Sequence, residues 1–112
     1  MALQIDEYQE KAHSTAFYKG MYKKDWTYPV TGLASEAGEV CGKFAKAVRD
    51  SNGYISEARK EDIIKELGDV CWFVAEIATV FDVKLSEVME KNLEKLEDRK
   101  KRGVLSGSGD NR

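Results

Sequence analysis

The chain has 112 residues, 42% of them hydrophobic and 34% charged, a length that fits one compact domain or one protomer of an oligomer but not a two-domain enzyme. The 18 basic residues nearly balance the 20 acidic ones, so the net charge of −2 gives no sign that a nucleic-acid polymer is the partner. Two cysteines are too few for a disulfide framework and no apolar run is long enough to cross a membrane, which together favour a cytoplasmic protein without a membrane partner.

The first half of the chain predicts two helices separated by an aromatic segment. A modest helix is expected over residues 5–18, where apolar residues recur at three- and four-residue steps. Residues 21–29 contain several aromatic side chains and predict a loop. A second helix is expected over residues 31–48, and its apolar stripe consists of Leu33, Ala37, Val40, Phe44 and Val48.

The second half predicts two further helices and a tail. The third helix, over residues 57–81, is the most apolar, and its stripe consists of Ile63, Leu67, Val70, Val74, Ile77 and Phe81. A fourth helix opens near Ser86, where a hydroxyl and the acids after it suit the free amides, and becomes strongly charged toward its end. Strand-like alternation is nearly absent. We therefore expect one all-α domain over residues 1–102 and a glycine- and serine-rich tail over residues 103–112.

An internal repeat is the most informative feature. Residues 33–41 recur thirty positions later as residues 63–71, with the shared pattern apolar-x-x-Glu-x-Gly-acid-Val-Cys. Acids three residues apart lie on the same side of a helix. Each copy therefore carries two carboxylates on one shoulder of its apolar stripe, namely Glu36 and Glu39 in the first copy and Glu66 and Asp69 in the second.

These carboxylates predict a metal site if the two helices pack antiparallel through their stripes. Four converging carboxylates repel one another unless cations neutralise them, and oxygen ligands suit Mg²⁺ or Mn²⁺ rather than zinc. The alternative is a solvated acidic face. Gly38 and Gly68 are expected to allow a close approach of the two backbones or to leave room for a ligand, and Cys41 and Cys71 are expected to be buried small hydrophobic residues.

At these residues the sequence resembles the MazG-like nucleotide pyrophosphohydrolases of the all-α NTP pyrophosphatase superfamily. The family pattern Glu-Glu-x-x-Glu, followed later by Glu-x-x-Asp, corresponds to residues 35–39 and 66–69, with Ser35 in place of the first glutamate. The resemblance implies a four-helix bundle that forms homodimers or homotetramers and carries a metal-binding helix hairpin. It implies Mg²⁺-dependent hydrolysis of a nucleoside triphosphate between the α and β phosphates. Glu36 or Glu39 is expected to be the general base.

Substrate contacts are expected from the fourth helix, and also from the first helix, the aromatic loop, the third helix and the tail. Four basic residues of that helix follow one another at four-, four- and three-residue steps and form one ridge, namely Lys91, Lys95, Arg99 and Arg102. The resemblance places this ridge and the neighbouring Asn92 near the triphosphate. Salt bridges within the helix are the alternative. His13 and Trp26 resemble positions that contact the base in relatives, and Phe73 is expected to wall the base pocket. The tail is expected to be disordered or to fold over phosphates with Arg112 as an extra donor.

A non-catalytic helical module that binds nucleotides or mediates oligomeric interactions is the alternative function. It explains the amphipathic helices and the charged faces, but it gives no reason for the doubled acid and glycine pattern. The sequence leaves open which base is preferred, so canonical deoxynucleotides, dUTP and damaged nucleotides all remain candidate substrates.

Overall fold

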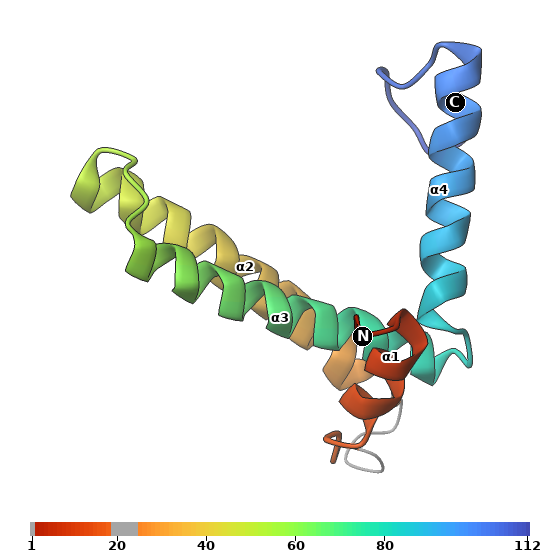
Figure 1. Cartoon of the computed structure of the whole chain (residues 1–112), viewed down its shortest axis with the longest axis horizontal. Helices are drawn as coiled ribbons and strands as arrows, with labels where there is room; N and C mark the ends of the chain where they lie inside the picture. Colours follow the sequence, from red (N-terminus) through yellow and green to blue (C-terminus); the bar gives the residue numbers. More distant parts are fainter. Residues whose placement is uncertain (1, 19–24) are drawn as a thin grey trace.

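The computed structural model describes residues 2–18 and 25–112. Within these ranges the regular secondary structure is helical, in agreement with the all-α prediction, and consists of α1 (Ile5–His13), α2 (Thr27–Ser51), α3 (Glu57–Val80) and α4 (Leu85–Arg102). Helices α2 and α3 lie side by side and a short turn joins them, whereas α4 leaves the other end of α3 at a steep angle (Figure 1). Helix α1 packs against α3 and the start of α4.

Helix α1 is five residues shorter than predicted. The hydroxyl of Thr15 donates to the carbonyl of Ala12 at 2.7 Å, and the hydroxyl of Ser14 donates to the carbonyl of Lys11 at 2.5 Å. Such local side-chain bonds compete with the next helical turn. The helix therefore ends at His13, and residues 14–18 form a connecting segment.

Helix α2 begins four residues earlier than predicted, at Thr27. Pro29 lies in its first turn, where a residue without an amide hydrogen costs little because these amides have no intrahelical acceptor. The aromatic segment predicted as a loop is therefore partly helical, and its residues 21–24 lie outside the described residues. The helix ends with Asn52 in the left-handed conformation, at a φ of 52°.

The face through which α2 meets α3 is rotated from the predicted stripe toward the acids. Pro29 and Ala47 are the buried residues of α2, and Glu36 lies about 20° from both around the helix at 100° per residue. Phe44 and Val48, which belong to the predicted stripe, lie about 60–100° away from that face. They are 47% and 69% exposed. Three of the five residues of the predicted stripe, Ala37, Phe44 and Val48, are thus left exposed within one chain.

Helix α3 shows the same shift. Leu67 and Phe81 belong to its predicted stripe and are 47% and 61% exposed, while Phe73 and Glu76 are buried. Cys41 and Cys71 are exposed free thiols, so the expectation that they are buried was wrong for the single chain. Their side of each helix faces away from the α2–α3 contact.

Helix α1 supplies the acceptors that cap α4. The amide of Ser86 donates to Asp6 Oδ1 at 3.0 Å and the hydroxyl of Ser86 donates to Asp6 Oδ2 at 2.8 Å. The amide of Leu85 donates to Gln9 Oε1 at 2.7 Å, and Gln9 is itself buried. First-turn amides have no acceptor in their own helix. Residues of α1, distant in sequence, thus cap α4, whereas the hydroxyl of Ser86, expected to cap the helix itself, donates to Asp6.

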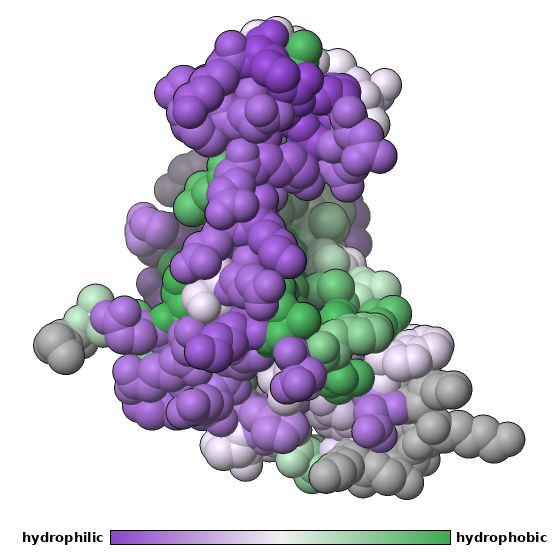
Figure 2. Space-filling model, turned by 90° about the vertical axis from the view of Figure 1, so that its right-hand side faces the viewer, coloured by the Kyte–Doolittle hydropathy of each residue, from purple (hydrophilic) through white to green (hydrophobic). Residues whose placement is uncertain are grey.

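Apolar surface is exposed where α4 leaves the rest of the chain. Figure 2 shows a hydrophilic upper part of α4 and, lower down, hydrophobic side chains around its junction with the other helices. A groove of about 300 Å³ at this junction is lined by Leu33, Val74, Ile77, Ala78, Phe81, Val83 and Val88. None of the described helices has the combination of length and apolar character that spanning a membrane requires.

Candidate active site

Three of the four predicted metal ligands come together where α2 and α3 pack. One carboxylate oxygen each from Glu36, Glu66 and Asp69 lie within 4.8 Å of one another. Glu36 and Glu66 are half-buried and Asp69 is exposed. Glu39, one turn further along α2, is exposed and does not belong to this group. The site is therefore open to solvent on the side of Asp69.

The electrostatics of this cluster favour a cation. The pKa of Glu36 lies above its ordinary value because the side chain is desolvated, because Asp69 is negatively charged nearby, and because Glu66 hydrogen-bonds to it and adds its charge. The charge of Glu39 contributes in the same direction. Among the described residues, none of these four acids forms a salt bridge. Oxygen ligands that repel one another and lack basic partners fit a hard divalent ion.

The repeat glycines do not mediate a close approach of the helices in one chain. A Cβ at Gly38 or Gly68 would meet no atom within 4 Å, so that part of the expectation was wrong. The close approach occurs instead at Gly32, which faces the ring of Phe73. Beside the acids, Gly38 and Gly68 leave open space, which is compatible with the second expectation, room for a ligand.

An aromatic cluster lies next to the acids. The buried Phe73 packs edge-on against Trp72 and Tyr28, with ring centroids 4.9 and 5.5 Å away. The indole of Trp72 donates to Thr15 Oγ1 at 2.9 Å, so Trp72 fastens α3 to the segment after α1. Phe73 was predicted to wall the base pocket. It lies within this cluster and does not line the pocket that the structure shows beside it, between α1 and the end of α3.

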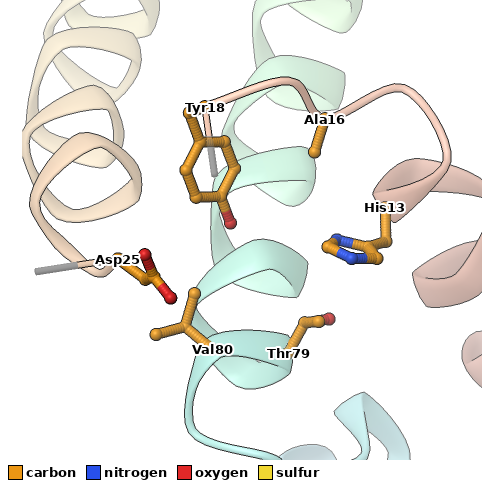
Figure 3. A pocket seen from close by; sticks show the side chains of 6 residues that line it. All are labelled: His13, Ala16, Tyr18, Asp25, Thr79 and Val80. Carbon is orange, nitrogen blue, oxygen red and sulfur yellow. The ribbon is translucent and has the colours of Figure 1, made fainter. Parts of the chain in front are cut away.

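A pocket of about 260 Å³ opens between α1, the segment after it and the end of α3. Figure 3 shows the side chains that line it, which are His13, Ala16, Tyr18, Asp25, Thr79 and Val80. His13 was a predicted base contact. Trp26, the other predicted base contact, is 43% exposed at the start of α2 and does not line this pocket.

Glu76 lies beneath the pocket and is fully buried. The hydroxyl of Tyr18 donates to Glu76 Oε2 at 2.7 Å, and Nδ1 of His13 lies 3.1 Å from the same oxygen. The pKa of Tyr18 is raised above its ordinary range, chiefly by burial and then by the bond to Glu76. Sequence reasoning missed Glu76. Its signal is a lone acid inside the apolar run 73–80, seven residues after Asp69.

The basic ridge of α4 is separated from the acids within one chain. Helix α4 contacts α1 and α3 but not α2 in the described structure, and it points away from the α2–α3 pair (Figure 1). Lys91 pairs with Glu87 at 3.2 Å and Arg102 pairs with Asp98 at 2.8 Å, so salt bridging within the helix, the alternative reading, holds for these two. Asn92 is exposed.

The tail folds back along α4 and occupies the other two basic residues. Asp110 lies 3.1 Å from Lys95 Nζ and 3.3 Å from Arg99 Nη2, and these bonds lower the pKa of its carboxyl. The guanidinium of Arg112 donates to the carbonyls of Val104, Leu105 and Gly109. In this arrangement Arg112 binds the tail itself.

Comparison with known proteins gives the same family as the motif. A model of the MazG nucleotide pyrophosphohydrolase domain matches residues 28–104. The chain is also similar to a protein of Mycobacterium phage L5 described as Gene 37 protein, with 46% identity over an alignment of 114 residues that covers 98% of this chain and 100% of the relative. A search of solved structures gave no significant match. Because the matched region spans most of the chain and includes the acids at the α2–α3 contact, the chain belongs to the MazG nucleotide pyrophosphohydrolase family.

Proposed function

We propose that the protein is a Mg²⁺-dependent nucleoside triphosphate pyrophosphohydrolase, which cleaves (d)NTPs between the α and β phosphates to (d)NMP and pyrophosphate. The observation that carries this proposal is the convergence of Glu36, Glu66 and Asp69 without a basic partner among the described residues. Family membership supports the reaction type.

The four acids have distinct tasks in this proposal. Glu36, Glu66 and Asp69, with Glu39, would hold Mg²⁺ or its substitute Mn²⁺, which supplies charge neutralisation for the phosphates and a lowered pKa for water. Of the two candidate bases, Glu39 lies outside the group of three oxygens, so it would be the ligand least engaged by the metal. It would therefore be the carboxylate best able to take the proton of the attacking water, with Glu36 as the second candidate.

Phosphate binding in this proposal requires a second copy of the chain. The ridge on α4 points away from the α2–α3 pair that carries the acids of its own chain (Figure 1), and α4 does not contact α2. We propose that the protein is a homodimer or homotetramer in which the ridge of one copy faces the acids of another, with Arg112 close to the same phosphates. Exposed apolar side chains such as Phe44 and Leu67 support such an assembly. His13, Trp26 and Phe73 are assigned to the base side of the substrate.

The cytoplasm is the proposed compartment for this activity. Cys41 and Cys71 are both free and exposed. Exposed free thiols are typical of proteins in reducing compartments.

The test is pyrophosphate release from a panel of deoxy- and ribonucleoside triphosphates in the presence of Mg²⁺. We expect turnover by the purified protein and its loss in Glu66→Gln and Asp69→Asn. Glu61→Gln, which changes an exposed acid on the same helix outside the cluster, is the matched control and keeps the activity. A folded protein that turns over none of the common triphosphates contradicts the proposal and leaves the non-catalytic module as the function.

A further inference from the structure

The fully buried carboxylate of Glu76 is not used by the proposed hydrolysis, and its burial requires compensation. Removing a carboxylate from water is costly unless hydrogen-bond donors satisfy it. Two groups from outside α3 lie within hydrogen-bonding distance: the hydroxyl of Tyr18, which donates to Oε2 at 2.7 Å, and Nδ1 of His13, which is 3.1 Å from Oε2 and 3.3 Å from Oε1. Both donors also line the pocket.

An ionised carboxylate accepts hydrogen bonds and donates none, so the His13 nitrogen that faces it carries the proton. In the neutral ring the lone pair then resides on Nε2, the nitrogen on the opposite edge. Among the described residues, Nδ1 has a hydrogen-bond partner, Glu76, and Nε2 has none. The His13 side chain is 53% exposed and lines the pocket.

The other polar side chains that line the pocket have no free proton to offer when Asp25 is ionised. The Tyr18 hydroxyl directs its proton to Glu76, and the Thr79 hydroxyl donates to the carbonyl of Ala75 at 3.1 Å. The carboxylate of Asp25, on the pocket wall in Figure 3, is an acceptor when ionised. The described lining therefore presents acceptors and selects a ligand that donates.

The pocket lies on the same side of α3 as the acids. Glu76 follows Asp69 by seven residues, which is about 10.5 Å along the helix axis and a net rotation of about 20°. A cavity of about 260 Å³ is smaller than the roughly 300–1,000 Å³ of pockets that enclose drug-sized ligands, and it suits a single ring system. A triphosphate at the acids and a base in the pocket would thus share one face of α3.

We infer that Glu76 is a positioning residue that holds His13 as the Nδ1–H tautomer, and that the resulting acceptor-lined pocket prefers nucleobases bearing an exocyclic amino group. This inference rests on the proposed hydrolase function. Cytosine and adenine present an amino group where uracil and hypoxanthine present a carbonyl oxygen. An amino hydrogen can bond to the acceptors of the pocket, whereas a carbonyl oxygen faces them as a second acceptor and leaves both unpaired.

The kinetic test compares matched substrate pairs in the full-length protein. We expect kcat/KM to be at least about tenfold higher for dCTP than for dUTP, and for dATP than for dITP. Glu76→Gln is expected to reduce both ratios toward one, mainly through KM. His13→Ala, which leaves Glu76 in place, is also expected to reduce both ratios toward one. Lys11→Ala, which changes an exposed residue of the same helix, is the control and is expected to keep both ratios. Equal kcat/KM within both pairs overturns the inference while leaving the hydrolase proposal intact.

A second test does not depend on turnover. His13 is the only histidine, so its two ring nitrogens can be observed by long-range proton–nitrogen NMR without assignment. At a pH where the ring is neutral, we expect the proton on Nδ1 in the unmodified protein and a shift toward the Nε2–H form in Glu76→Gln. We also expect dCMP to perturb the ring signals more than dUMP. A dominant Nε2–H tautomer in the unmodified protein, or equal perturbation by the two monophosphates, overturns the inference. Absence of any turnover would contradict the proposed function without affecting this measurement.

Discussion

The ring of Phe73 on α3 lies so close to Gly32 on α2 that a Cβ at residue 32 would be 2.2 Å from Cε1 of the ring. This contact fixes the separation of the two helices at the end of the pair where the aromatic cluster forms. Phe73 lies between Asp69 and Glu76 in sequence and on the same side of α3. The spacing of the acids and the shape of the neighbouring pocket therefore depend on the same contact.

Gly32→Ala is expected to destabilise the protein by about 1–3 kcal/mol, because the added methyl group forces the buried ring or the helices apart. Urea unfolding measures the change in the free energy of unfolding. Gly42→Ala on the same helix is the control, since a Cβ there meets nothing within 4 Å. It is expected to be neutral or to stabilise the protein by up to about 1 kcal/mol. Equal stability of the two variants would show that the contact does not constrain the helices.

Mg²⁺ is expected to raise the melting temperature of the unmodified protein and to have little effect on Asp69→Asn. A ligand that binds only the folded state stabilises it by mass action. Without metal, Asp69→Asn is expected to be slightly more stable than the unmodified protein, because one of the charges that raises the pKa of Glu36 is gone. Thermal unfolding monitored by circular dichroism, with and without Mg²⁺, measures both effects. An equal Mg²⁺-induced shift in the variant would exclude Asp69 as a ligand.

Asp6 is expected to make stability depend on pH in the acid range. The hydrogen bonds from Ser86 lower the pKa of Asp6 below its ordinary value of 3.8. A lowered folded-state pKa means that the carboxylate stabilises the fold fully above 3.8 and loses this effect as the pH falls through the lowered pKa. Asp6→Ala should therefore be less stable than the unmodified protein near neutral pH, with a difference that shrinks in acid. Glu10→Ala, an exposed acid of the same helix, serves as the control in denaturant unfolding across this pH range. A difference independent of pH would contradict the capping role.

Asp110→Asn is expected to loosen the tail from α4. The carboxylate bridges Lys95 and the buried Arg99, and the neutral amide loses the attraction to both. Hydrogen exchange of the backbone amides in residues 104–112 should become faster, while exchange within α2 and α3 stays unchanged. High salt should have the same effect on the unmodified protein by screening the exposed carboxylate. Unchanged exchange in the tail would show that the Asp110 carboxylate is not what holds it in place.

The exposed apolar stripe is expected to mediate self-association. Phe44→Glu or Leu67→Glu places a charge on this surface and should reduce the sedimentation coefficient without loss of helical circular dichroism. Lys46→Glu changes an exposed residue of α2 that lies off the apolar stripe and is the control. If all these variants sediment like the unmodified protein, the stripe is not the interface.

The helices and the acids were predictable from sequence because both depend on local periodicity. The repeat identified Glu36, Glu66 and Asp69 through their spacing alone. The rotation of the packed face toward Glu36 was not predictable, because it depends on how closely Gly32 lets Phe73 approach from another helix. The direction of α4 was equally hidden, since it follows from the turn at Asp82, where φ is 56°, and from capping by α1.

Glu76 shows why a part of the candidate site escaped detection. A single acid inside an apolar helical run gives no sign of a function in the sequence unless the residues that it contacts are known. Those partners, His13 and Tyr18, come from a segment about sixty residues earlier in the chain.

Because α1 caps α4, the folded structure depends on residues that precede the region matched by the family model. The family model begins at residue 28, after α1, yet Asp6 and Gln9 bind the first amides of α4, and His13 lies over Glu76. A chain shortened to residues 28–104 keeps every acid of the cluster at the α2–α3 contact but leaves the start of α4 without its acceptors and the buried Glu76 without its two partners. On the proposed function and the inferred role of His13, two relatives that differ only before residue 28 would share the same acids and still differ in which nucleotide they select.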